Sequence, residues 1–311
     1  MLDSVSKNVF HALAASGRLK SVASRHGMRR PTSFARRFVA GETVDEAIAA
    51  ARAIEAKGLA QTLDLLGESV DSPAAAATAT RGYLALLDAI AAAGIGRNIS
   101  LKLTQLGLDI DQATCLDNLT RILEVAGESG FFVRIDMENS PYTDATLDVL
   151  ETVWTNGHRN VGTVLQTCLY RTEQDLERLI RLGARVRLVK GAYREPAAVA
   201  HQSKAEVDAA YARMVQTLLL RGTHPAFATH DPAIIEQARA FAGQHKVPAD
   251  AYEFQMLYGI RRDLQTSLAR AGHTVRVYVP FGHEWFPYFM RRLGERPANV
   301  FFVLRGILGE A

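Results

Sequence analysis

Hydrophobic residues along this chain form short runs that alternate with longer amphipathic segments. Runs of about four to eight apolar residues predict buried parallel strands, and the segments between them predict crossover helices. The predicted strands are 59–65, 98–103, 131–136, 161–166, 185–190, 225–229, 251–256 and 275–279. The helices that follow them are predicted at 73–93, 112–129, 143–156, 172–182, 203–221, 232–245, 260–271 and 284–294.

Eight strand–helix units in succession predict an α/β fold, namely a (β/α)8 barrel. A doubly wound open sheet is the rival architecture, because periodicity alone does not prove closure. No linker or low-complexity block interrupts the eight units, and this continuity favours a closed barrel.

The segment before the first predicted strand differs in charge from the rest of the chain. Residues 1–41 contain eight Lys or Arg and one acid, Asp3. Such a segment is compatible with a transit peptide, but basic helices that lean on the barrel or on anionic lipid are the simpler interpretation. A further helix is predicted at 43–57, with Thr43 as its N-cap. We therefore predict a helical extension over 1–57 and a barrel over 58–311.

Composition excludes several classes of protein. No apolar run reaches about 18 residues, so no membrane span is expected. Cys115 and Cys168 are the only cysteines, which excludes a disulfide framework and favours a reducing compartment such as the cytoplasm. The formal net charge of +3 is too small to indicate a nucleic-acid partner. The nine His residues show no metal-ligand spacing, and no metal site is expected.

Polar residues gather where the predicted strands end. Each could be an ordinary rim residue, because a barrel mouth needs polar side chains. Together they converge on the C-terminal face, where the active sites of such barrels are built. The residues concerned are Lys102, Asp136, Gln166, Arg187, Lys190, Thr229, His230 and Tyr278.

The last predicted helix carries a more specific pattern. Tyr288, Arg291, Arg292 and Glu295 are spaced to share one helical face. Two adjacent guanidinium groups offer forked donors that suit a carboxylate or a phosphate. The alternative is a solvated basic face that the helix dipole favours at a C-terminal end.

Several long motifs coincide with these strand ends. They are SLKLTQLG (100–107), VRIDME (133–138), VRLVKGAY (186–193), FATHD (227–231), YEFQMLYG (252–259) and YVPFGHEWFPYFMRRLGERPANVFFV (278–303). In these motifs the chain resembles the proline dehydrogenase family in its short, single-function bacterial form. The resemblance implies a distorted (β/α)8 TIM-type barrel with N-terminal helices and bound FAD. It also implies oxidation of L-proline to Δ1-pyrroline-5-carboxylate, with hydride transfer to flavin N5 and a membrane quinone as electron acceptor.

The resemblance also implies roles for individual residues in substrate binding. Lys102, Arg291 and Arg292 resemble the clamp for the proline carboxylate, and Asp136 resembles an acid that balances these cations. The walls of the ring pocket are implied at Leu257, Tyr278 and Tyr288. Glu295 is expected to orient an arginine across one helical turn.

A second set of residues is implied to contact the flavin. Arg187 is expected near flavin N5, where a cation stabilises the negative charge of the reduced ring. Lys102, Arg187 and Asp136 together form the expected catalytic group. The full set of expected flavin contacts is Gln166, Arg187, Val189, Lys190, Gly191, Ala192, Thr229 and His230.

Two other functions remain open from the sequence. Lys190 at a strand end could form a Schiff base, as the lysine of a barrel lyase or aldolase does. The barrel could also bind an amino acid or a flavin without turnover. For the main hypothesis we expect a cytoplasmic enzyme whose basic N-terminus allows a peripheral contact with the inner face of the membrane.

Overall fold

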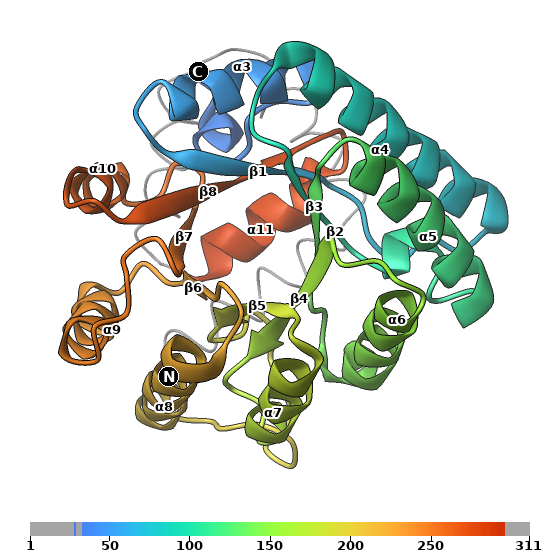
Figure 1. Ribbon diagram of the computed structural model, residues 1–311. Helices are drawn as coiled ribbons and strands as arrows, with labels where there is room; N and C mark the ends of the chain where they lie inside the picture. The colour runs from blue at the N-terminus through green and yellow to red at the C-terminus, as the bar shows by residue number, and fades with distance from the viewer. Residues whose placement is uncertain (1–27, 29–32, 296–311) are drawn as a thin grey trace.

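Eight parallel strands close into a barrel in which each strand pairs with its neighbour in the chain and β8 pairs back with β1. The computed structural model describes residue 28 and residues 33–295 of the 311. Figure 1 shows the crossover helices as an outer ring, with α11 projecting over the centre of the strands. The closed ring confirms the (β/α)8 prediction and excludes the doubly wound sheet.

The strands lie close to their predicted positions. They are β1 Ala60–Leu65, β2 Asn98–Leu101, β3 Phe132–Ile135, β4 Val161–Gln166, β5 Arg185–Val189, β6 Ala226–Ala228, β7 Glu253–Leu257 and β8 Thr274–Phe281. β8 extends two residues further than predicted, because its ladder with β1 continues to the pair Leu65 and Phe281. β2 and β3 end earlier than predicted, so that Lys102 and Asp136 follow the strands.

The helices also follow the sequence pattern. They are α3 Val44–Glu55, α4 Pro73–Ala93, α5 Gln112–Glu128, α6 Thr143–Thr155, α7 Thr172–Leu182, α8 Lys204–Arg221, α9 Pro232–Gln244, α10 Arg262–Arg270 and α11 Trp285–Glu295. Thr43 and Glu46 form the capping box that opens α3. α10 begins two residues later than predicted, since Arg261 adopts a left-handed conformation with φ 48°.

The N-terminal extension is described only in part. The prediction of helices within residues 1–40 falls mostly outside the described residues, which include a short 3-10 helix at Phe34–Arg37. α3 packs against β1 and β8, so this part of the extension leans on the barrel. None of the helices that the structure describes is long and apolar enough to cross a membrane.

A separate hydrophobic cluster fixes α11 over the barrel. Trp285 and Phe289 are buried against Phe38, and the Phe38 and Phe289 ring centroids are 6.1 Å apart. The indole of Trp285 donates a hydrogen bond of 3.0 Å to Glu42. These contacts hold the helix that carries the two predicted clamp arginines.

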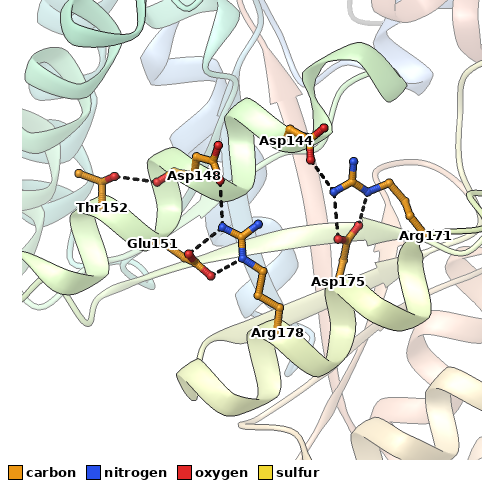
Figure 2. Close-up of polar contacts among 7 residues, drawn as sticks. All are labelled: Asp144, Asp148, Glu151, Thr152, Arg171, Asp175 and Arg178. Carbon is orange, nitrogen blue, oxygen red and sulfur yellow. Dashed lines mark hydrogen bonds and ion pairs between the residues drawn. The ribbon is translucent and has the colours of Figure 1, made fainter.

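The outer surface between α6 and α7 carries a ladder of ion pairs, which Figure 2 shows. Arg178 on α7 pairs with Asp148 and Glu151 on α6, at 2.9 Å for Asp148. Arg171 pairs with Asp144 at 2.6 Å and with Asp175 at 2.7 Å. These pairs lie outside the barrel wall and join two neighbouring crossover helices.

Candidate active site at the barrel mouth

A cavity of about 450 Å³ opens at the C-terminal ends of the strands. Every predicted site residue except Glu295 lines it. Those residues are Lys102, Asp136, Gln166, Arg187, Val189, Lys190, Gly191, Ala192, Thr229, His230, Leu257, Tyr278, Tyr288, Arg291 and Arg292. Glu295 is the last residue of α11, and its side chain lies outside what the structure describes. The structure therefore brings the two predicted sets, substrate and cofactor, into one cavity.

Strand alternation explains why these residues share the cavity. Side chains two positions apart on a strand point to the same face. Ser100 and Lys102 therefore both face the barrel interior, as do Arg134 and Asp136 on the next strand. Leu101 between the first pair packs into the hydrophobic core outside the strands.

Asp136, Arg187 and Tyr278 form a hydrogen-bonded group in the cavity wall. Asp136 accepts from the Arg187 guanidinium at 2.7 Å and from the Tyr278 hydroxyl at 2.7 Å. Arg187 also donates to the Ser100 hydroxyl at 3.0 Å, and its guanidinium lies 5.3 Å from the Tyr278 ring centroid. Burial and nearby carboxylates raise the pKa of Tyr278 well above its usual value. The phenol therefore stays neutral and is fixed in place.

Lys102 has a carboxylate neighbour that the sequence analysis missed. Asp64 on β1 is 1% exposed, and its carboxylate lies 3.9 Å from the Lys102 ammonium. Burial raises the pKa of Asp64, and Lys102 opposes this rise without cancelling it. Burial lowers the pKa of Lys102, but the surrounding carboxylates raise it further, so the net direction is upward. Lys102 is thus a buried cation at neutral pH.

The counter-ion of Arg291 is Glu68, which the sequence analysis also missed. The two side chains meet at 2.7 Å. Burial raises the pKa of Glu68, but Arg291 lowers it further, so the net direction is down. Asp136 was the acid expected to balance the whole clamp. It hydrogen-bonds Arg187 and Tyr278, and its charge also helps to raise the pKa of Lys102.

Arg292 lies against an aromatic ring of its own helix. Its guanidinium is 5.2 Å from the ring centroid of Tyr288, a cation–π distance. The predicted shared face of these two residues is therefore confirmed. Both line the cavity, which argues against a merely solvated basic face.

Gly191 closes the cavity wall at a place where no side chain fits. Its φ is 123°, and a Cβ there would lie 2.4 Å from the sulfur of Cys168. Glycine is therefore required by both conformation and space. Beside it, Gln166 donates to the Glu138 carbonyl at 2.8 Å, which fixes the amide.

Lys190 is held by two acids at the cavity rim. Its ammonium lies 2.6 Å from Asp208 and 3.4 Å from Asp231. A Schiff base requires an amine that is free to attack a carbonyl carbon, and both acids contact the Lys190 nitrogen. The geometry thus argues against the lyase alternative.

Further residues line the cavity that sequence reasoning did not single out. Tyr193 lies within a quoted motif, and burial raises its pKa to about 12. The apolar ones among the others gave a weak sequence signal, because apolar lining looks like ordinary core, and the polar ones were not singled out. They are Met137, Val164, Lys204, Ala228, Asp231, Gln255 and Met256. In the described part of the chain, no group of three His, Cys, Asp or Glu could hold a metal ion.

Comparison with known proteins identifies relatives over most of the chain. The family model for proline dehydrogenase matches residues 47–305. The chain is 46% identical to proline dehydrogenase of Deinococcus radiodurans over 280 residues, which cover 89% of this chain and 90% of that one. It is 40% identical to proline dehydrogenase 1 of Bacillus subtilis strain 168 over 302 residues, with 97% and 99% covered.

A solved structure shares the architecture. The crystal structure of proline utilization A from Bdellovibrio bacteriovorus, inactivated by N-propargylglycine, superposes with a TM-score of 0.78 at 26% identity. The match covers 84% of this chain and 32% of that one, so this chain spans about a third of that protein's length. From the family model and the relatives together, this chain belongs to the proline dehydrogenase family.

Proposed function

We propose that this protein oxidises L-proline to Δ1-pyrroline-5-carboxylate with FAD as its cofactor, as the first step of proline catabolism. The observation that carries the proposal is one cavity that combines a fixed phenol, three cations and a glycine-lined wall. The cations are Lys102, Arg291 and Arg292. A cyclic amino acid needs both an anion site and an apolar wall, and this cavity offers both.

The cofactor side of the cavity fits a flavin. Arg187 lines the cavity with a guanidinium that Asp136 holds in place, so a fixed cation lies beside any ligand bound there. Gly191 leaves a wall without side chain, which allows close approach of a large planar ring. We assign the holding of FAD to Gln166, Arg187, Val189, Lys190, Gly191, Ala192, Thr229 and His230. When bound, a flavin supplies the two-electron acceptor for the hydride that leaves proline C5.

The substrate side would be built by residues from the end of β2 and from β7, β8 and α11. Lys102 and the arginines of α11 would bind the carboxylate and so fix the orientation of the ring. Tyr278, held by Asp136, would form a rigid wall on one side of that ring. Leu257 and Tyr288 would exclude water from the others. Arg187, which belongs to the same hydrogen-bonded group as Tyr278, would face the flavin.

The later fate of the electrons is part of the same proposal. A quinone would accept them, and the basic N-terminal segment would make a peripheral contact with the inner face of the membrane in a cytoplasmic protein. The basic charge of residues 1–41 supports such a contact, because anionic lipid attracts it.

The test is product formation. Purified protein supplied with FAD, L-proline and a soluble quinone analogue should form a pyrroline that o-aminobenzaldehyde traps, in equal amount to the quinone reduced. Bound FAD without product would favour the non-catalytic barrel. Covalent trapping of a carbonyl substrate on Lys190 by borohydride would favour the lyase.

A further inference from the structure

Four carboxylates, those of Asp64, Glu68, Asp136 and Glu138, act on Lys102, and Asp64 is the one among the described residues that forms an ion pair with it. Asp136 and Glu68 each accept a hydrogen bond of 2.7 Å from an arginine. Asp64 accepts no hydrogen bond from an arginine among the described residues, and its ion-pair partner there is Lys102. The Tyr278 hydroxyl and the Arg187 guanidinium also lie near enough to lower its pKa, but less than Lys102 does. Asp64 is therefore the counter-ion that belongs to Lys102.

The distance between the two groups is informative. At 3.9 Å the charges attract strongly in a buried setting, but the separation is too long for a hydrogen bond. An ammonium has three donors, and Lys102 makes no hydrogen bond to another described residue. Lys102 lines the cavity, whereas Asp64 lies behind it in the strand wall. The ammonium is thus paired by charge while its donors remain available to a ligand.

We propose that Asp64 is a positioning residue for the substrate carboxylate. It keeps the Lys102 ammonium charged at the cavity surface and leaves the ammonium's donors for the ligand. An acid within hydrogen-bond distance would accept the hydrogen bonds that the ammonium could otherwise donate to the ligand. An apolar residue in place of Asp64 would leave the buried ammonium without its ion-pair partner. The inference deepens the proposed function and rests on it for the identity of the ligand.

The consequence is a dependence of carboxylate binding on pH. Burial favours the neutral amine of Lys102, and Asp64 is the first of the acids that oppose this effect. Without the Asp64 charge, the pKa of Lys102 falls and the amine becomes neutral at a lower pH. Binding of a carboxylate should then weaken on the alkaline side. The other ionisable groups near Lys102 are Glu68, Asp136, Glu138, Tyr193 and Arg291.

The experiment measures binding of tetrahydro-2-furoate by calorimetry between pH 7 and pH 10. This probe has the shape of proline but no amine, so it does not itself titrate in that range. Wild-type affinity should change little with pH. Asp64→Asn should bind almost as well as wild type at pH 7 and about tenfold more weakly at pH 10, the loss expected when the pKa of Lys102 falls to about one unit below that pH.

A second substitution tests whether Asp64 acts through Lys102. Lys102→Arg in the Asp64→Asn background should restore the flat profile, because a guanidinium stays protonated when buried. Asp175→Asn is the matched control, since Asp175 is also a buried acid and pairs with Arg171, and neither residue lines the cavity. Its profile should match the wild type.

Two outcomes would overturn the inference. One is an Asp64→Asn profile that superimposes on the wild type, and the other is a loss that Lys102→Arg does not correct. Should Asp64→Asn fail to fold, Asp64→Ser takes its place with the same expectations. A wild-type protein that binds the probe as expected but never oxidises proline would refute the proposed function and leave the role of Asp64 standing.

Discussion

The ion pairs on the outer helices and those at the barrel mouth use the same residue types at similar distances. Arg178 and Asp148 meet at 2.9 Å on the surface, and Arg187 and Asp136 meet at 2.7 Å in the mouth. Their exposure differs, with side chains 30% and 56% exposed in the first pair and 6% and 13% in the second. Water and salt screen the charges of the outer pair. In the inner pair water is largely excluded, so each charge is compensated mainly by the other member of the pair.

This difference separates a structural use of charge from a functional one. The outer ladder of Figure 2 links α6 to α7, and either partner of a pair can be solvated if the other is lost. At the mouth, Asp136 accepts hydrogen bonds from both Arg187 and Tyr278, so one carboxylate fixes two side chains of the cavity wall. Removing a charge should therefore change the free energy of unfolding and the proline oxidation activity much more at the mouth than on the outer helices.

The largest effect is expected for Asp136→Ala. The change leaves Arg187 buried without its acid and frees the Tyr278 hydroxyl. Breaking a buried pair in this way typically costs about 3–5 kcal/mol. We expect a loss of that order in the free energy of unfolding, measured by urea denaturation, and nearly complete loss of proline oxidation. Asp148→Ala on α6 is the control, and equal effects in the two variants would refute the comparison.

Substitution of Arg292 should act on substrate binding. Loss of one charge from a desolvated pair costs about 2–5 kcal/mol, so Arg292→Met should raise the KM for proline about 30-fold or more. Arg292→Lys should recover only part of this, because an ammonium cannot make a forked contact. Steady-state kinetics and flavin content check both statements. An unchanged KM with normal flavin content would exclude Arg292 from the clamp.

Glu253 tests buried charge at the opposite end of the barrel, where it pairs with Arg276 at 2.9 Å. Burial raises the pKa of Glu253, but Arg276 lowers it further, and the net direction is down. A carboxylate with a lowered pKa in the folded state stabilises the fold at pH values above its unfolded pKa of about 4.3. This stabilisation is lost as the pH falls through the folded-state pKa. Glu253→Gln should therefore cost about 2 kcal/mol at pH 7. Unfolding curves at pH 7 and pH 3 should show this difference shrinking; a constant difference would contradict the assignment.

The smallest effect is expected on the outer ladder. Arg178→Gln removes two surface ion pairs, and exposed pairs contribute less than about 1 kcal/mol. The free energy of unfolding should fall by no more than that, and proline oxidation should be unchanged. A loss comparable to that of Asp136→Ala would mean that exposure does not govern the difference between the regions.

The fold was predictable because its signals are local. Apolar runs and amphipathic segments recur in a fixed order, and caps such as Thr43 and Ser72 mark helix starts. The last residues of β8 were missed because Phe281 is set by its pairing with Leu65, far away in the chain. Strand ends also predicted the cavity residues, since parallel strands bring them to one face.

The counter-ions could not be predicted from the sequence for a similar reason. Glu68 and Arg291 are 223 positions apart, and nothing in the sequence near either residue specifies the other. Asp64 lies inside an apolar run, and the sequence alone does not tell whether its side chain points into or out of the barrel. Only the register of β1 against β2, which sets Asp64 opposite Ser100, places it beside Lys102 and gives it that ion-pair partner among the described residues.

The absorbance spectrum of the purified protein tests the central claim most directly. The protein should be yellow, with the bands of oxidised FAD, and acid or heat should release the flavin, as expected for non-covalent binding. Addition of L-proline without oxygen should bleach these bands, and a soluble quinone should restore them. A protein that takes up no FAD, or whose flavin bands persist unchanged in excess L-proline, would contradict the account.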